Sequence, residues 1–218
     1  PSLWVGTILA ARTGSIESAG DRVATRPARR PLPDRFEVMV VAADRPAGET
    51  GSEPFNLSPS DVVALKLGFP SEHSRVLRGS LAVPTALRQP HLATAQALVV
   101  LAHGVREPDT GGTRLALAAG ADGPWLGAHD LRRLVAHAGD VPRLPPLVVL
   151  MACDAGRGPT LAGEDGGQDL ATACLEAGAQ TVVVATDRIP LRRALDFCGR
   201  FGRALRSGQS PAAAVHRL

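Results

Sequence analysis

The sequence predicts an α/β fold, a three-layer αβα sandwich in which helices cover both faces of a mostly parallel β-sheet. Short apolar runs at residues 36–43, 97–102, 147–151 and 181–185 contain almost no polar residue, which is typical of strands buried on both faces. Segments with helical spacing separate these runs, and strands that alternate with helices form parallel sheets. With 218 residues, of which 44% are hydrophobic, the chain is long enough for one such domain.

The first 35 residues differ in composition from the rest. Residues 3–11 alternate loosely and precede Thr13-Gly14, a pattern that predicts a short hairpin. Residues 21–34 hold three prolines and several arginines, as a solvated linker does, or alternatively a proteolytic processing site. We divide the chain into an N-terminal hairpin and basic linker at 1–35 and a folded domain at 36–218. A start without Met and an end inside a predicted helix favour a piece of a longer protein.

Capping and turn residues predict the elements between the buried runs. Ser58 and Pro59 predict the start of a helix that ends near Gly68, and Asp122-Gly123 predicts the turn of a β-hairpin. The other expected elements are a strand near 76–81, a helical turn at 84–89, a polar loop at 105–112, hairpin strands at 113–119 and 124–126, helices at 128–138, 168–177, 191–205 and from 211, and a glycine-rich loop at 156–167.

Composition and missing motifs exclude several functions. A net charge of +3 and 3% aromatic residues argue against nucleic-acid binding, and no apolar run approaches the roughly 20 residues of a membrane span. Three cysteines without a CxxC pair favour neither a disulfide framework nor a zinc site, which points to a reducing, cytoplasmic location. The sequence holds no GxSxG elbow and no P-loop, and we expect neither a metal nor a cofactor.

A histidine and a cysteine each follow one of the buried runs. His103 comes after residues 97–102, and Cys153 closely follows residues 147–151. Reacting groups in parallel sheets gather beyond the carboxyl ends of the strands, so the two side chains can meet if the strands are neighbours. An imidazole that takes the proton of a thiol makes it a good nucleophile. Each residue alone is more often part of a core, but the pair predicts a His–Cys dyad.

These motifs resemble the CHAT family of caspase-like cysteine peptidases, in clan CD. His103-Gly104 matches the family's strand-ending His-Gly. Residues 150–156, Leu-Met-Ala-Cys-Asp-Ala-Gly, are similar to its Leu-Ser-Ala-Cys-x-[Ser/Thr]-Gly, with Met151 and Ala155 as departures. The resemblance extends over residues 97–218 and includes, further along, residues 163–164, 170–171, 177–179, 182–183 and 208–214.

The resemblance implies a caspase-hemoglobinase-like fold and a role for each residue of the motifs. Cys153 would be the nucleophile, His103 the general acid/base, and the backbone N–H groups of Gly104 and Cys153 the oxyanion hole; a glycine at 104 leaves room for the substrate carbonyl. The family's Leu-Trp and acidic pair after the last strand are replaced here by residues 186–191, Thr-Asp-Arg-Ile-Pro-Leu. Asp154 and Asp187 are candidate substrate-binding residues; Asp187 could bind a basic P1 side chain or simply begin the next loop.

Three functions remain open on the sequence alone. The first is a cysteine endopeptidase that cuts a protein or peptide; relatives of this kind imply the effector part of a larger bacterial protein, often in defence, controlled by a sensor or regulatory region in the same protein or complex. The second is an inactive caspase-like domain that serves as a protein-interaction module. The third is an unrelated α/β hydrolase or nucleotide-binding domain, which requires His103 and Cys153 to lie far apart.

Overall fold

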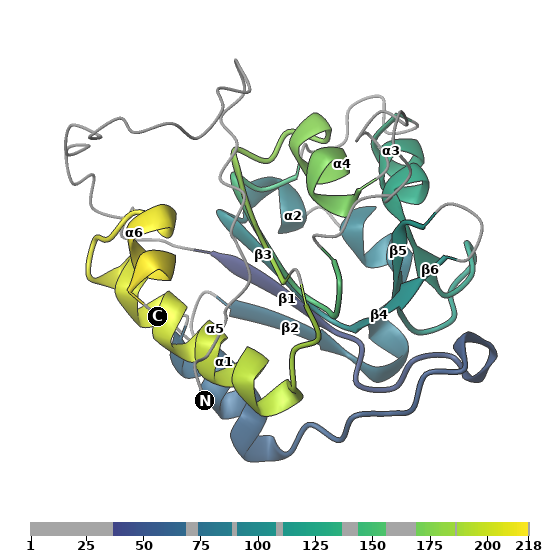
Figure 1. The fold of residues 1–218 in the computed structure, drawn as a ribbon, viewed down its shortest axis with the longest axis horizontal. Coiled ribbons are helices and arrows are strands. Elements are labelled where there is room, and N and C mark those ends of the chain that lie inside the picture. The colour runs from purple at the N-terminus through teal and green to yellow at the C-terminus, as the bar shows by residue number, and fades with distance from the viewer. Residues whose placement is uncertain are drawn as a thin grey trace.

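A parallel β-sheet forms the centre of the protein (Figure 1). The computed structural model describes residues 37–68, 74–88, 91–107, 111–136, 144–155, 169–185 and 187–217. Within these ranges the central sheet has five strands in the order β2-β1-β3-β7-β8, and every neighbouring pair is parallel. The strands are β1 (Val38–Ala42), β2 (Ser74–Arg78), β3 (Ala97–Leu101), β7 (Leu147–Met151) and β8 (Thr181–Val184). The predicted α/β fold class is confirmed.

Side chains of the central strands divide between two cores, one on each face of the sheet. Leu98 and Val100 of β3 point into one core, and Val99 and Leu101 point into the other. Every residue of β1, β3 and β7 is buried. The unbroken apolar runs of the sequence follow from this double burial, because alternate residues of a strand face opposite sides.

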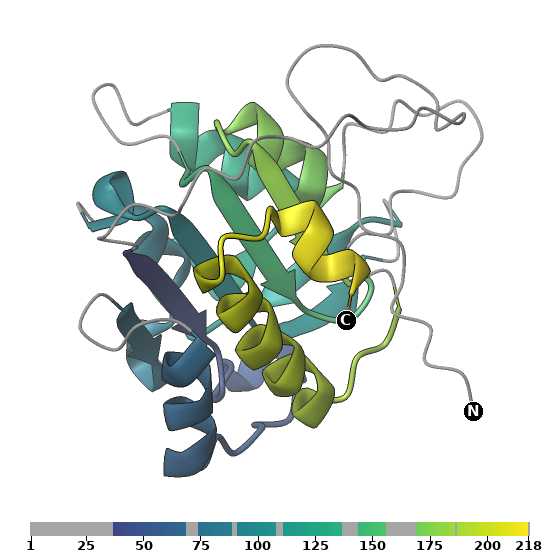
Figure 2. The ribbon, with the colours of Figure 1, turned by 90° about the vertical axis from the view of Figure 1, so that its left-hand side faces the viewer.

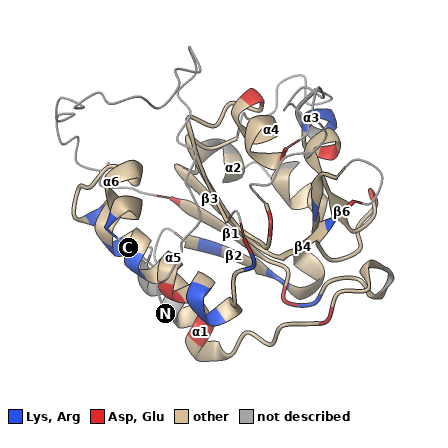
Figure 3. Ribbon diagram, in the orientation of Figure 1, with Lys and Arg blue, Asp and Glu red and all other residues tan. Residues whose placement is uncertain are grey.

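Helices cover both faces of the sheet (Figures 1 and 2). On one side lie α1 (Pro59–Gly68), α5 (Leu191–Arg206) and α6 (Pro211–His216), and on the other lie α2 (His91–Thr94), α3 (Ala128–Ala136) and α4 (Leu170–Glu176). Right-handed crossovers account for the helices between strands: the chain steps from β1 to β2 in one direction and from β2 to β3, β7 and β8 in the other, so α1 lies on the opposite face from α2, α3 and α4. Helices α5 and α6 follow β8 and pack on the same face as α1. Charged residues lie mainly on the outer helices and connections, while β1, β3 and β7 carry none (Figure 3).

Three helices begin at side chains that cap them. The Ser58 hydroxyl accepts a hydrogen bond from Asp61 N, and the Asp61 carboxylate accepts one from Ser58 N, a reciprocal pair that uses up free N–H groups of the first turn. Asp169 and Ser210 cap α4 and α6 with one side-chain oxygen each, which accepts a hydrogen bond from Thr172 N and from Ala213 N. The predicted helix starts at Pro59 and Pro211 are confirmed.

A second, antiparallel sheet follows directly from β3. Its strands are β4 (His103–Arg106), β5 (Thr113–Ala116) and β6 (Trp125–Leu126), and β5 and β6 form the predicted hairpin. The prediction of a loop from residue 105 is wrong in its first residues, because Val105 and Arg106 pair with β5. Strand β2 also ends earlier than predicted, since Gly79 turns the chain with a φ of 52° into a 3₁₀ turn over residues 79–81.

The predicted hairpin and linker at 1–35 and the glycine-rich loop at 156–167 lie outside the described residues. The boundary between residues 35 and 36 therefore stays a prediction.

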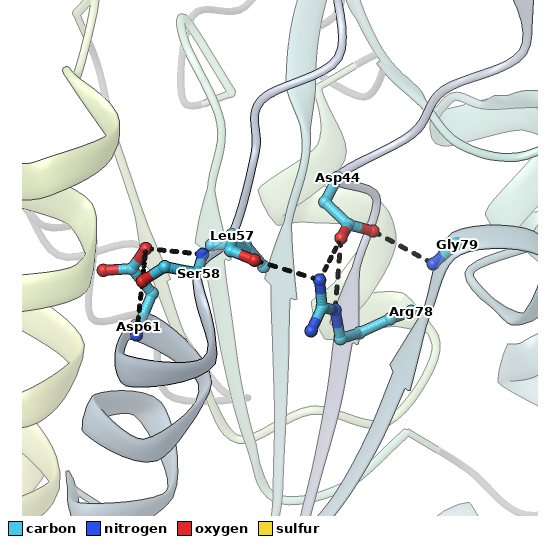
Figure 4. A network of polar contacts seen from close by, with 6 residues as sticks. All are labelled: Asp44, Leu57, Ser58, Asp61, Arg78 and Gly79. Atoms are coloured by element: carbon cyan, nitrogen blue, oxygen red, sulfur yellow. Dashed lines mark hydrogen bonds and ion pairs between the residues drawn. The ribbon is translucent and has the colours of Figure 1, made fainter.

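Asp44, which follows β1, and Arg78, the last residue of β2, link the carboxyl ends of these two neighbouring strands (Figure 4). Arg78 donates to Asp44 Oδ2 from Nε at 3.1 Å and from Nη2 at 2.7 Å, and Gly79 N donates to Asp44 Oδ1 at 3.0 Å. The Arg78 guanidinium also donates to the Leu57 carbonyl at 3.2 Å. Burial by itself raises the pKa of Asp44, but the bonds and charge of Arg78 and the Gly79 N–H outweigh it, so this pKa lies below its ordinary value of 3.8.

Asp44→Asn should destabilise the fold in a pH-dependent way. A pKa that is lowered by folding stabilises the folded state above pH 3.8, and this contribution is lost as the pH falls through the lower folded-state pKa. At pH 7 we expect a loss of about 1–3 kcal/mol in the free energy of unfolding, because Arg78 loses its carboxylate partner. Urea unfolding of wild type and variant between pH 7 and pH 3 measures this difference. The difference in the free energy of unfolding should become smaller toward pH 3. A difference that does not change with pH would contradict the lowered pKa of Asp44. Asp122→Asn, on an exposed turn, serves as the control.

Candidate active site

His103 and Cys153 leave the sheet from neighbouring strands. Strands β3 and β7 pair in parallel with Leu101 opposite Met151, and Ala102 N donates to Met151 O at 3.3 Å just beyond the paired residues. His103 lies two residues after Leu101, and Cys153 lies two residues after Met151. The parallel pairing therefore brings the histidine and cysteine positions to the same edge of the sheet.

The backbones of Gly104 and Cys153 approach each other so closely that no side chain fits at position 104. A Cβ atom on Gly104 would lie 1.8 Å from Cys153 O and 2.9 Å from Cys153 C. Both atoms belong to the main chain, so they cannot turn aside as a flexible side chain could. The close approach explains why a glycine follows His103, and it sets the main chain of the His103 strand against that of the cysteine.

The imidazole of His103 is held by a segment from another strand end. Its Nε2 lies 2.7 Å from the carbonyl oxygen of Glu53, and the Phe55 ring meets it edge to face with 5.1 Å between the ring centroids. A carbonyl oxygen only accepts hydrogen bonds, so Nε2 must carry the hydrogen. The neutral ring then keeps its lone pair on Nδ1, which can act as a base.

Cys153 begins a tight turn that two other parts of the chain hold in place. Its side chain is half-buried, and Sγ lies 4.0 Å from the carbonyl of Ile189. The next residue, Asp154, has a φ of 56°, an unusual conformation for a residue other than glycine. The Thr113 hydroxyl donates to Asp154 O at 2.9 Å, and Asp154 N donates to Asp187 O at 3.4 Å.

The two acidic residues predicted to bind substrate lie close together in the backbone. The bond from Asp154 N to Asp187 O joins the turn after β7 to the segment after β8. The Asp154 residue is half-buried and Asp187 is exposed. The structure thus brings His103, Gly104, Cys153, Asp154 and Asp187 to one edge of the sheet.

The other two cysteines have a different environment. Cys174 on α4 and Cys198 on α5 are buried, and burial raises the pKa of each thiol to about 12, with a further contribution from Asp169 at Cys174. Among the described residues, no group of three or more His, Cys, Asp or Glu side chains could hold a metal ion. None of the helices in the described ranges has the length and apolar character needed to cross a membrane.

Several residues that shape this site were not predicted. Glu53 and Phe55 fall in a polar segment whose contact with His103 has no signal in the sequence. Thr113 was expected only as a strand residue, and Ile189 only as part of the segment after the last strand. Their contacts join residues 36 to 50 positions apart, which spacing in the sequence cannot reveal.

The fold and the residues at its sheet edge define a caspase-like α/β protein. The chain belongs to the CHAT family: the model of the CHAT domain matches residues 9–218, and this family is related to the caspase-like cysteine peptidases. The match begins at residue 9, inside the segment 1–35 that composition assigns to a separate hairpin and linker. It also includes residues 36–96, in which no family motif was recognised. No curated protein matches the sequence. The family assignment removes the unrelated hydrolase or nucleotide-binding domain from the candidate functions.

Gly104→Ala should disrupt the site by a steric clash. The added methyl group would meet the Cys153 carbonyl at 1.8 Å, and relief requires β4 and the Cys153 turn to move apart. We expect a loss of about 1–3 kcal/mol or more in the free energy of unfolding, measured by chemical denaturation. Gly48→Ala is the matched control, because a Cβ there meets no atom within 4 Å. Equal stability of the two variants would show that the close approach is absent.

Alkylation should distinguish Cys153 from the other cysteines in the folded protein. With a pKa of about 12, Cys174 and Cys198 are ionised in only about one molecule in ten thousand at pH 8, and both are buried. Iodoacetamide should therefore add one group, located at Cys153 by peptide mapping, and should add three after unfolding. Rapid labelling of Cys174 or Cys198 in the native protein would contradict the burial of these helices against the sheet.

Proposed function

We propose that the protein is a cysteine endopeptidase in which Cys153 is the nucleophile and His103 is the general acid/base. The observation that supports it best is the contact between Gly104 and Cys153 together with the His103–Glu53 hydrogen bond. The first sets a backbone without a side chain beside the thiol residue, and the second leaves Nδ1 of His103 as the basic nitrogen. Caspase-like ancestry supports the same reaction class.

The proposed reaction has two stages. His103 Nδ1 takes the proton of Cys153, and the thiolate attacks the peptide carbonyl carbon to form a C–S bond. The backbone N–H groups of Gly104 and Cys153 stabilise the negative oxygen of this intermediate. The C–N bond then breaks as His103 gives its proton to the leaving amine. Water, deprotonated by His103, cleaves the thioester and restores the thiol, so no cofactor is consumed.

Asp154 and Asp187 are proposed to contact the substrate. Asp154 directly follows the nucleophile in the sequence, and Asp187 lies near it because its carbonyl oxygen accepts a 3.4 Å hydrogen bond from Asp154 N. The carboxylates of both residues suit a basic P1 side chain. The alternative, in which Asp187 only begins the segment that leads to α5, is equally compatible with its exposure. We further propose that a sensor or regulatory region, in the same protein or in a complex with it, controls cleavage of a protein substrate. The second candidate, an inactive domain that binds other proteins, uses the same fold without cleavage.

A fluorogenic peptide library tests the activity and its P1 preference together. Cys153→Ala and His103→Gln should each lower kcat/KM by at least about 10³-fold, because neither partner replaces the other. Cys174→Ala and His216→Ala are matched controls, the latter on the exposed face of α6, and both should keep wild-type kcat/KM. If Asp187 binds a basic P1 side chain, the wild type should cleave faster after Arg or Lys than after other residues. Asp187→Asn should reduce this preference. Cleavage that survives Cys153→Ala would rule out the dyad. A folded protein that does not cleave even together with its regulatory region would support the interaction module.

A further inference from the structure

A single guanidinium holds both ends of the segment that contacts His103 (Figure 4). Residues 44–57 connect β1 to the helix cap at Ser58. Arg78 binds the carboxylate of Asp44 at the start of this segment and the carbonyl of Leu57 at its end. Asp44 is only 3% exposed, so its carboxylate depends on these partners in place of water.

The middle of the same segment reaches the site. Glu53 accepts from His103 through its backbone carbonyl, and Phe55 packs against the imidazole. Residues 53, 54 and 56 are exposed, so neighbouring side chains do little to fix this stretch. The first half has its own anchors, since Ala47 N donates to Leu117 O at 3.0 Å and the Thr50 hydroxyl donates to Ala47 O at 2.6 Å. The second half, which carries Glu53 and Phe55, ends at the Leu57 carbonyl that Arg78 holds.

We propose that Arg78 and Asp44 are positioning residues for His103: their ion pair, bonded to the Leu57 carbonyl, orients the segment whose Glu53 carbonyl keeps the hydrogen of His103 on Nε2. This inference rests on the proposed peptidase function. Burial of the Leu57 side chain, at 6% exposure, limits where the segment end can lie, but the bond to its carbonyl also fixes how the following peptide unit is turned. Loss of that bond frees the Glu53 carbonyl to rotate, and the imidazole then populates both neutral tautomers.

The planar fork of arginine is essential to this arrangement. Nη2 carries two hydrogens and donates one to Asp44 and one to Leu57, while Nε adds a second bond to the same carboxylate oxygen. A lysine keeps the positive charge for Asp44 but lacks the fixed fork. Arg78→Lys should therefore keep the ion pair with Asp44 but lose the hydrogen bond to the Leu57 carbonyl. Arg75→Lys is the matched control, because Arg75 is an exposed arginine on the same strand, β2.

The experiment combines peptide turnover with the tautomer of His103. Long-range ¹H–¹⁵N NMR of histidine-labelled protein reports which ring nitrogen carries the hydrogen, with His103→Gln used to assign the signal among the six histidines. In Arg78→Lys we expect kcat to fall about 10–100-fold with KM nearly unchanged, and the Nε2–H signal of His103 to give way to a mixture of tautomers. Arg75→Lys should match the wild type in both measurements.

Each other outcome has a definite meaning. Wild-type turnover in folded Arg78→Lys overturns the proposal, and so does lost turnover with an unchanged His103 tautomer. If the wild type shows no turnover that depends on Cys153 even together with its regulatory region, the peptidase function fails, and the tautomer comparison alone then decides whether Arg78 positions His103. If Arg78→Lys does not fold, Asp44→Asn replaces it, since it keeps the side-chain volume and an acceptor for Gly79 N; an unchanged tautomer there overturns the proposal.

Discussion

The parallel pairing of β3 with β7 is the constraint on which the candidate site depends. Because Leu101 lies opposite Met151, the residues that follow each strand emerge side by side at the carboxyl edge of the sheet. A shift in register would separate Gly104 from Cys153 and would also turn the buried side chains of one strand to the wrong core. The register is therefore fixed by packing on both faces, and the site inherits its geometry from the core.

Polar contacts from the flanking strands complete this edge. The segment after β1 supplies the contacts to His103, the segment after β8 supplies the Asp187 and Ile189 carbonyls beside Cys153, and Thr113 on the small antiparallel sheet holds the turn from a third direction. Most of these contacts use backbone atoms. Their position is thus set by the path of the chain more than by the identity of the residues, which leaves the sequence of such segments free to vary while the geometry is kept.

Burial separates Cys153 from the other two cysteines. Cys174 and Cys198 lie in the two cores on opposite faces of the sheet, where low polarity disfavours the thiolate. Cys153 lies outside both, half-buried at the polar edge. The distinction follows from where each residue falls relative to its element: on the inner face of a helix in two cases, and beyond the end of a strand in the third. The chain belongs to the CHAT family, and the position of Cys153 outside both cores is the feature on which the proposed thiol chemistry depends.

The sequence by itself determined the buried strands, the starts of α1 and α6 and the hairpin at β5 and β6, because apolar runs, caps and turn residues act over short stretches of chain. The motifs around His103 and Cys153 indicated the family. The sequence also singled out His103 and Cys153, since each follows a strand whose burial on both faces is visible in its composition. Only the tertiary structure decided that β3 and β7 are neighbours, that Val105 and Arg106 continue into a strand, and that Glu53 and Phe55 meet His103. Strand order, and contacts between residues as far as 50 positions apart, depend on how the helices pack and on which backbone groups remain to be paired. No local sequence pattern predicts them.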